Sequence, residues 1–161
     1  MSTNASPPTK HALDYLSFRV GEQDFCLDIN SVREIRSGSP VTPLPHAPDY
    51  MRGVINLRGT VLPIMDLACR LGMAHAPDDP RSVIIVVEGS TGPIGLLVRA
   101  VSDILSISMS DLRPLPAQAD QSGIAFLQSL ALLERGVIKL LNLEAVLSAN
   151  PPANCIVLHD D

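Results

Sequence analysis

The chain of 161 residues contains a weak copy of itself. Residues 16–35 and 85–104 align without a gap at an offset of 69, which sets apolar residues beside apolar residues and Glu34 beside Asp103. Self-similarity at a fixed offset is the signature of a duplicated structural unit, and it limits the folds that the whole chain can adopt. We therefore expect two copies of one small module that pack against each other.

A second stretch supports the duplication in the same order along the chain. Residues 61–67 (VLPIMDL) align with residues 137–143 (VIKLLNL) at an offset of 76. Chance similarity between apolar strands is the simpler explanation for either match alone, but two matches in the same order favour duplication. The larger offset indicates a longer loop in the second copy.

The apolar runs predict an all-β fold. They are short, bounded by turn residues and about ten in number, as in β-sandwiches and small barrels. We expect strands at residues 15–20, 24–29, 32–35, 54–57, 60–65, 82–88, 94–99, 102–106, 126–133 and 136–141, and short helices at 47–51, 67–71 and 143–147. Two pseudo-repeated five-stranded β-barrel subdomains that share a hydrophobic core, each formed by one copy curled on itself, would leave few exposed edges.

The two ends of the chain differ from its middle. Residues 1–13 are polar and contain a proline pair, and residues 150–161 contain another. The sequence therefore predicts a mobile N-terminal tail at 1–13, a folded domain at 14–149 and a C-terminal tail at 150–161. No run approaches the roughly 20 apolar residues of a membrane-spanning helix, and the N-terminus lacks a signal-peptide pattern.

Composition disfavours binding to nucleic acid. Charged residues make up 18% of the chain, the net charge is −5 and aromatic residues make up 3%. Nucleic-acid-binding proteins usually have a basic surface and aromatic stacking platforms. Three widely spaced cysteines without a CxxC pair are typical of a reducing compartment, so we expect a cytoplasmic protein.

The sequence lacks the motifs of catalysis. We find no Walker A lysine motif, no GxGxxG fingerprint after a strand and no GxSxG elbow, and the four histidines are isolated. An enzyme with Cys26 or Cys69 as nucleophile is the weakest alternative, because a buried cysteine usually acts as a small hydrophobe. We therefore expect no catalytic activity, no cofactor and no metal site.

One polar group stands out in an apolar hairpin, residues 53–67 (GVINLRGTVLPIMDL). Arg58 falls at the expected turn, where side chains reach solvent, and Gly59 can adopt the positive φ that tight turns need. A guanidinium pairs readily with carboxylates at interfaces. Two interpretations stay open: Arg58 binds a partner, or it only ties down its own turn by pairing with Glu34.

Six apolar positions recur in both copies or beside the repeat, and periodicity alone assigns most of them to the core: Leu16, Ile29, Val32, Ile35, Val98 and Val101. A duplicated module must also create a junction between its copies. If some of these positions line that junction, they form an apolar groove suited to an amphipathic helix.

These segments resemble the CheW family of bacterial chemotaxis coupling proteins. The resemblance covers about residues 14–148 and is strongest in GVINLRG (53–59), PIMDL (63–67) and the spaced residues of 25–35, 95–101 and 140–143. It implies two five-stranded barrels with a shared core and an adaptor without catalytic activity. The implied partners are the CheW-like regulatory domain of the chemotaxis histidine kinase and the cytoplasmic tip of methyl-accepting receptors, in membrane-associated arrays.

By position, the resemblance assigns a partner-binding surface to Glu34, Gly53, Asn56, Arg58 and Gly59, and a receptor-tip groove to the six apolar positions. It assigns the kinase to the other barrel, where the sequence names no residue. A monomer is expected outside arrays. The alternatives are a CheW-like adaptor of a non-flagellar pathway (twitching or surface behaviour) and a small-barrel module that binds a peptide or small ligand.

Overall fold

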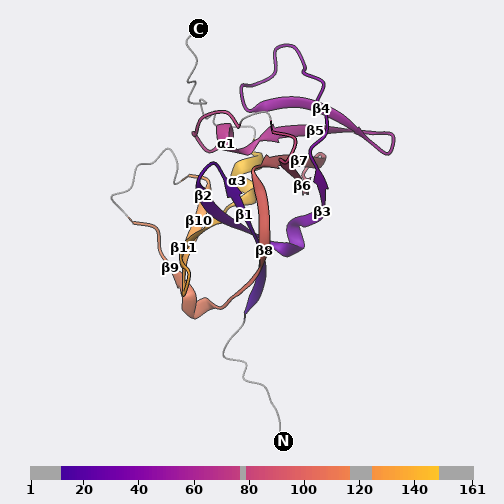
Figure 1. Ribbon diagram of the computed structural model, residues 1–161. Coiled ribbons are helices and arrows are strands. Elements are labelled where there is room, and N and C mark those ends of the chain that lie inside the picture. Colours follow the sequence, from indigo (N-terminus) through magenta and orange to yellow (C-terminus); the bar gives the residue numbers. More distant parts are fainter. Residues whose placement is uncertain (1–11, 77–78, 117–124, 149–161) are drawn as a thin grey trace, which may run out of the picture.

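The computed structural model describes residues 12–76, 79–116 and 125–148, and most of this part of the chain is β-structure (Figure 1). Its strands are β1 (Leu13–Val20), β2 (Gln23–Asp28), β3 (Val32–Ser37), β4 (Met51–Leu57), β5 (Thr60–Asp66), β6 (Val83–Gly89), β7 (Gly92–Val98), β8 (Ala100–Ile107), β9 (Leu112–Arg113), β10 (Leu127–Leu133) and β11 (Gly136–Leu141). Short helical segments connect them: η1 (Ile29–Ser31), α1 (Leu67–Arg70), η2 (Met109–Asp111) and α3 (Leu143–Leu147). No helix among the described residues is long and apolar enough to cross a membrane.

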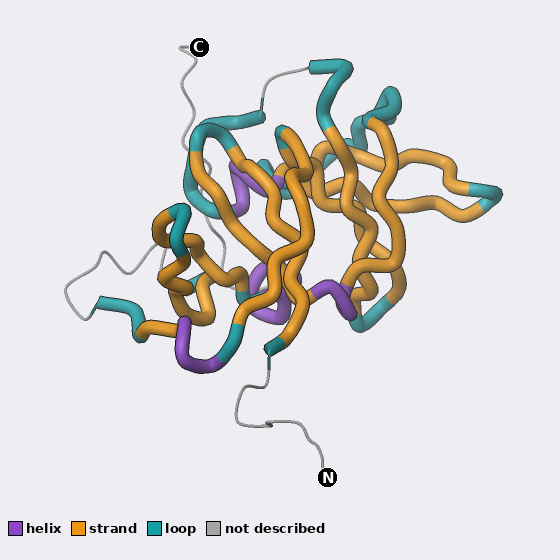
Figure 2. The backbone as a smooth tube through the Cα atoms, turned by 60° about the horizontal axis from the view of Figure 1, so that its bottom comes forward, coloured by secondary structure: helices purple, strands orange, loops and turns teal. Residues whose placement is uncertain are grey.

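The strands form two adjacent sheets (Figure 2). The six-stranded sheet has the order β8-β1-β2-β11-β10-β9, and the five-stranded sheet has the order β3-β6-β7-β5-β4. The first sequence copy supplies β1 to β5, and the second supplies β6, β7, β8, β10 and β11. The all-β prediction with two repeated halves and few short helices is therefore confirmed.

The two copies exchange their first hairpins, which the sequence did not predict. β1 and β2 of the first copy pair with β8 and β11 of the second, whereas β6 and β7 of the second copy pair with β3 and β5 of the first. The expectation that each copy curls on itself is therefore wrong. The chain leaves β2 through η1, where the Asp28 side chain accepts from the Asn30 N–H, and enters the other sheet. Apolar periodicity reports how deeply a strand is buried, not which strand lies beside it.

Apolar clusters fill each sheet and the space between the sheets. The shared cluster takes β1, β2, β6 and β7 residues such as Phe18, Phe25, Ile85 and Val87. Each sheet also encloses a smaller cluster on its other side. β6 shows the consequence most clearly, since Ile85 faces the shared cluster while its neighbour Ile84 faces the cluster of the five-stranded sheet. Side chains on both faces of β6 are therefore buried.

Most expected elements lie within a few residues of their predicted bounds. The helix expected at 47–51 is absent, because residues 49–50 form a turn, closed by a hydrogen bond from the Met51 N–H to the Pro48 carbonyl, and β4 begins at Met51. β9 is a short strand inside a segment that the sequence assigned to a loop. β1 begins at Leu13, the last residue of the expected N-terminal tail. The rest of that tail as far as residue 11, and the C-terminal tail, lie outside the described residues.

Candidate partner-binding site

The β4–β5 hairpin ends in a two-residue turn that presents Arg58 to solvent. Arg58 (φ 52°) and Gly59 (φ 84°) both have positive φ, as the type I′ hairpin turn requires. Asn56 stabilises this turn, because its Oδ1 accepts a hydrogen bond from the Gly59 N–H at 2.9 Å. In Figure 1 the hairpin extends beyond the neighbouring strands. An arginine in the left-handed region is uncommon, so the turn is held by its neighbours rather than by the preference of Arg58 itself.

Arg58 makes an ion pair with Glu34 on β3. The distance from Arg58 Nη2 to Glu34 Oε1 is 2.6 Å, and Arg36 Nη1 lies 3.5 Å from Glu34 Oε2. The hydrogen bond from Arg58 lowers the pKa of the Glu34 carboxyl, with a smaller contribution from Arg36 and an opposing one from burial. The Arg58 side chain is 69% exposed, so water competes for it and the pair contributes little to stability. This is the contact that the turn-tying interpretation foresaw, and its exposure also leaves Arg58 accessible to a partner.

Gly53 positions the hairpin by allowing another segment to approach. A Cβ at this position would lie 2.1 Å from the Thr42 carbonyl oxygen, and its φ of 141° disfavours other residues. Thr42 forms a β-bridge with Val54, so the proline-containing segment before β4 lies directly against that edge strand. The role of Gly53 is therefore to shape the base of the hairpin from inside.

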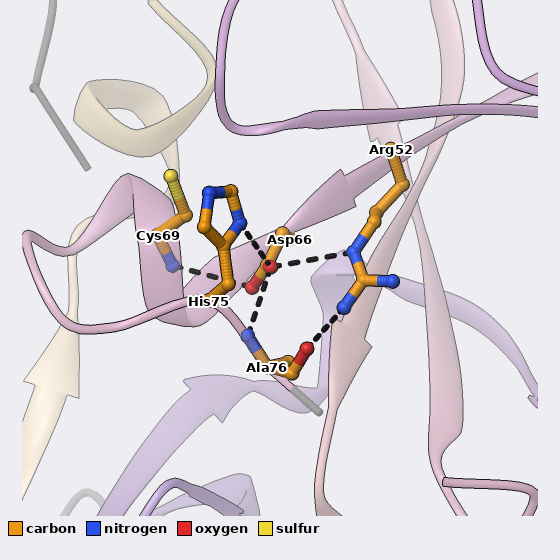
Figure 3. A network of polar contacts seen from close by, with 5 residues as sticks. All are labelled: Arg52, Asp66, Cys69, His75 and Ala76. Carbon is orange, nitrogen blue, oxygen red and sulfur yellow. Dashed lines mark hydrogen bonds and ion pairs between the residues drawn. The ribbon is translucent and has the colours of Figure 1, made fainter. Parts of the chain in front are cut away.

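The end of β5 holds a buried carboxylate that the sequence did not single out (Figure 3). Asp66 is fully buried and accepts hydrogen bonds from the backbone N–H groups of Cys69 (3.2 Å) and Ala76 (3.0 Å) and from Arg52 Nε (3.4 Å). His75 Nδ1 lies 3.4 Å from the same carboxylate, and Arg52 also donates to the Ala76 carbonyl. These contacts cap α1 and fix the segment after it, so we assign the network a structural role.

Among the described residues, the surroundings of one of the two candidate nucleophiles, Cys26, disfavour reactivity. Cys26 is buried, and burial raises its pKa to about 12, which disfavours the reactive thiolate. No group of three or more His, Cys, Asp or Glu residues within 12–76, 79–116 and 125–148 is arranged to hold a metal ion.

The six apolar positions fall into three classes of exposure. Leu16 and Val98 are buried in the shared cluster, Ile29, Val32 and Val101 pack partly buried against it, and Ile35 is 45% exposed. Only the last two classes reach the surface, so Leu16 and Val98 can support a groove from below but offer a partner almost no area. Val61, which pairs with Asn56 across the hairpin and is 66% exposed, adds apolar surface that the sequence analysis missed.

The second copy repeats the ion pair. Arg135, in the turn between β10 and β11, lies 3.2 Å from Asp103 on β8. Asp103 is the repeat counterpart of Glu34, and Val137, the counterpart of Val61, is also exposed. We call Glu34, Asn56, Arg58 and Val61 the first hairpin face, and Asp103, Leu132, Arg135 and Val137 the second hairpin face.

Comparison with known proteins decides which family has this architecture. The model of the CheW-like domain matches residues 14–150, nearly the whole described chain. The chain belongs to the CheW family. It is 46% identical over 146 residues to the chemotaxis protein CheW of Rhizobium meliloti, which covers 91% of this chain and 94% of the relative. It is 47% identical over 135 residues to a probable chemotaxis protein CheW of Rhizobium etli, covering 84% and 87%.

A solved structure agrees with the CheW assignment. The crystal structure of the scaffolding protein TtCheW from Thermoanaerobacter tengcongensis superposes with a TM-score of 0.78 at 28% identity, covering 88% of this chain and 97% of that one. The family resemblance noted in the sequence is therefore confirmed. CheW-family proteins are scaffolds of chemotaxis signalling, and the repeated halves described above are the form that this scaffold takes here.

Proposed function

We propose that this CheW-family protein is a non-catalytic adaptor that couples methyl-accepting chemotaxis receptors to the chemotaxis histidine kinase. It acts in the cytoplasm, at membrane-associated receptor arrays. The observation that supports this most directly is the exposed Arg58–Glu34 pair at the tip of a projecting hairpin, in a chain that matches the CheW-like domain from end to end of its described part.

The first hairpin face has the properties of a contact surface. Arg58 offers a guanidinium that can form a two-pronged contact with a partner carboxylate, and Glu34 keeps it oriented until that partner arrives. Gly53, Asn56 and Gly59 set the hairpin geometry without needing to touch the partner. Because the ion pair is exposed, exchanging Glu34 for a partner carboxylate requires little desolvation.

The receptor tip would contribute apolar area from an amphipathic helix. Ile29, Val32 and Val101 lie at the surface of the shared cluster, where the two sheets meet, and each keeps part of its side chain accessible. Helix-in-groove binding uses such spaced apolar anchors. Coupling further requires that the adaptor bind the receptor or the kinase differently in the active and inactive states. Equal binding to the two states would leave the equilibrium between them unchanged.

Reconstitution with receptors in membranes tests this function. Kinase autophosphorylation is measured with receptor-containing vesicles, with and without the protein, before and after addition of a receptor ligand. We expect a large increase that the ligand reverses. Arg58→Glu should remove most of the increase while the protein still unfolds in one cooperative transition, at a temperature only slightly below that of the wild type. Arg81→Glu is the matched control, because Arg81 is 88% exposed and pairs only with its near neighbour Asp79 among the described residues.

Each result has a definite meaning. No stimulation by the folded wild-type protein would contradict coupling and would favour a different chemosensory pathway or a peptide-binding module. Normal stimulation by Arg58→Glu would contradict the assignment of Arg58. An equal loss with Arg58→Glu and Arg81→Glu would mean that net charge, rather than the first hairpin face, controls binding.

A further inference from the structure

A buried arginine lies where the two copies of the repeat meet. Arg70 ends α1 in the first copy, and its side chain is fully buried. Its Nε donates to the Val146 carbonyl at 2.8 Å, and its Nη2 donates to the carbonyls of Ala145 at 3.4 Å and Ser148 at 2.5 Å. These acceptors form the last turn of α3, in the second copy. One side chain therefore donates to three carbonyls at the end of this helix, of which the Ala145 carbonyl also accepts from the Ser148 N–H.

Two aromatic rings enclose the same guanidinium. The Cζ atom of Arg70 lies 4.5 Å from the ring centroid of Tyr50 and 5.0 Å from that of Phe126. Tyr50 and Phe126 are related by the offset of 76. Their carbonyls accept equivalent hydrogen bonds, Tyr50 from the Asp66 N–H and Phe126 from the Asn142 N–H. The guanidinium thus lies between equivalent positions of the two copies, next to the axis that relates them.

The repeat is broken at Arg70. Asp66 caps α1 and Asn142 caps α3, each by accepting from the N–H of the residue three positions later. The same offset makes Val146 the counterpart of Arg70, and Val146 is buried and apolar. Two guanidinium groups here would place like charges in one small buried volume, at a high desolvation cost. One copy therefore supplies the cation and the other supplies the carbonyls.

The contacts of Arg70 differ in kind from the rest of the junction. The shared cluster is apolar, and apolar burial is non-directional, so it stabilises several relative placements of two sheets almost equally. Hydrogen bonds from a planar guanidinium and contacts with two ring faces have narrow geometric limits. Loss of the cation would leave the carbonyl of the buried Val146 without this donor.

We propose that Arg70 is a positioning residue that holds the two sheets in one relative orientation and thereby sets the spacing between the first and second hairpin faces. The Arg70 contacts described above lie at the junction of α1 and α3 rather than on either face, so it acts through the α1–α3 contact. The orientation itself is independent of the proposed function. The functional importance of this orientation rests on the proposed function, because an adaptor that bridges two partners needs its two binding surfaces at a fixed spacing.

Residual dipolar couplings test the orientation directly. Backbone N–H couplings are fitted separately for the six-stranded and five-stranded sheets, which gives one alignment tensor for each. In the wild type one tensor should describe both sheets. In Arg70→Met, which removes the cation, and Arg70→Lys, which keeps a charge but loses the planar fork, each sheet should keep its own good fit while the two tensors differ. The control Arg19→Met removes a pair with Asp24 inside one hairpin and should leave a single tensor.

Binding of each partner, and the coupling between the two binding events, give a second test. Lowered stability alone would not produce the expected result. For folded Arg70→Met, we expect the affinity for each partner alone to stay within about twofold, while the coupling between the two binding events falls about tenfold. A single tensor for both sheets in folded Arg70→Met would overturn the proposal. Loss of the fold in both Arg70 variants would also overturn it, because Arg70 would then serve folding rather than orientation. Separate tensors in a protein whose wild type stimulates no kinase would support the role of Arg70 and contradict only the proposed function.

Discussion

The first hairpin face and its counterpart in the second copy share an ion pair but differ in the turn that presents it. The first pair is shorter, 2.6 Å against 3.2 Å, and its carboxylate is more buried. In the first turn Arg58 and Gly59 have positive φ, and Asn56 accepts from the Gly59 N–H. At the repeat position of Asn56 the second hairpin has Leu132, which is exposed and cannot hold a turn in this way.

This difference shows how the two halves of a duplicated scaffold can carry different surfaces. Strand pairing and an ion pair with the hairpin turn occur in both copies, although Arg135 aligns with Gly59 rather than with Arg58. The residues at the hairpin tips are solvent-exposed, so they can change without disturbing the core. Each face has an exposed valine, Val61 or Val137, and the faces differ in polarity where the first has Asn56 and the second has the exposed Leu132. The following predictions test how far the two faces differ, beginning with the largest effect.

Gly53→Ser should destabilise the fold far more than Ser129→Gly does at the equivalent position of the second hairpin. Both residues adjoin a register shift in their β-ladders. A Cβ on residue 53 would collide with the Thr42 carbonyl and force a positive φ on serine, so we expect a loss of about 3 kcal/mol. Removing the Ser129 side chain should cost about 0.5–1 kcal/mol. Urea unfolding measures both, and equal losses would contradict the special role of Gly53.

Arg58→Glu and Arg135→Glu should separate the two faces by function. Arg58→Glu should weaken binding of a receptor-tip fragment at least about tenfold, because it repels a partner carboxylate and breaks the pair with Glu34. Arg135→Glu, which breaks the corresponding pair with Asp103, should change that affinity by less than about twofold. Isothermal titration calorimetry provides both values. A tenfold loss in each variant would mean that the receptor tip does not distinguish the faces.

Asn56→Ala should destabilise the first hairpin by about 1 kcal/mol, since it removes the side-chain acceptor of the Gly59 N–H. Leu132→Ala at the equivalent position should cost less than about 0.5 kcal/mol, because Leu132 is exposed. Hydrogen exchange of the Gly59 amide should accelerate in Asn56→Ala alone. Unchanged exchange at Gly59 would show that the backbone holds the turn without Asn56.

The smallest effect concerns pH. The folded protein holds the Glu34 carboxyl at a lowered pKa, so the pair with Arg58 stabilises the fold above the usual pKa of a glutamate. That contribution is lost as the pH falls through the lowered value. The difference in unfolding temperature between wild type and Glu34→Gln should therefore be present at neutral pH and shrink as the pH falls below the usual pKa of a glutamate and through the lowered pKa of Glu34. A difference that persists at the lower pH would show that Glu34 acts through packing rather than charge.

Local features were predictable because they depend on neighbouring residues. The turn at Arg58 and Gly59, the short helix after Asp66 and the doubly buried strand β6 all follow from sequence patterns within a few residues. The ion pair between Glu34 and Arg58 was foreseen as one of two interpretations of the hairpin. The Arg135 pair was harder to find, because the offset of 69 aligns Asp103 with Glu34 but the offset of 76 aligns Glu134, not Arg135, with Arg58.

Burial of charged residues was not predictable in the same way. Asp66 and Arg70 are fully buried, although charged side chains are normally exposed unless they are paired. Their partners, the Ala76 N–H and the α3 carbonyls, come from segments that no local pattern connects to them. The burial of Leu16 and Val98 was not predictable for a different reason. An apolar residue in a strand gives the same sequence pattern whether it lines a groove or lies in the core.

For this protein, the chain order of apolar and turn residues was enough to establish a duplicated all-β scaffold and to mark the Arg58 hairpin. Three other features are visible only in the folded chain. They are the exchange of hairpins between copies, the burial of Arg70 between the two copies, and the division of the apolar positions between core and surface. Turn and strand preferences act between neighbours, so they can be read along the sequence. Which strands pair, and how deeply a side chain is buried, depend on contacts between residues far apart in the chain. One pattern of apolar and polar residues is compatible with several such pairings, so the pattern alone does not decide between them.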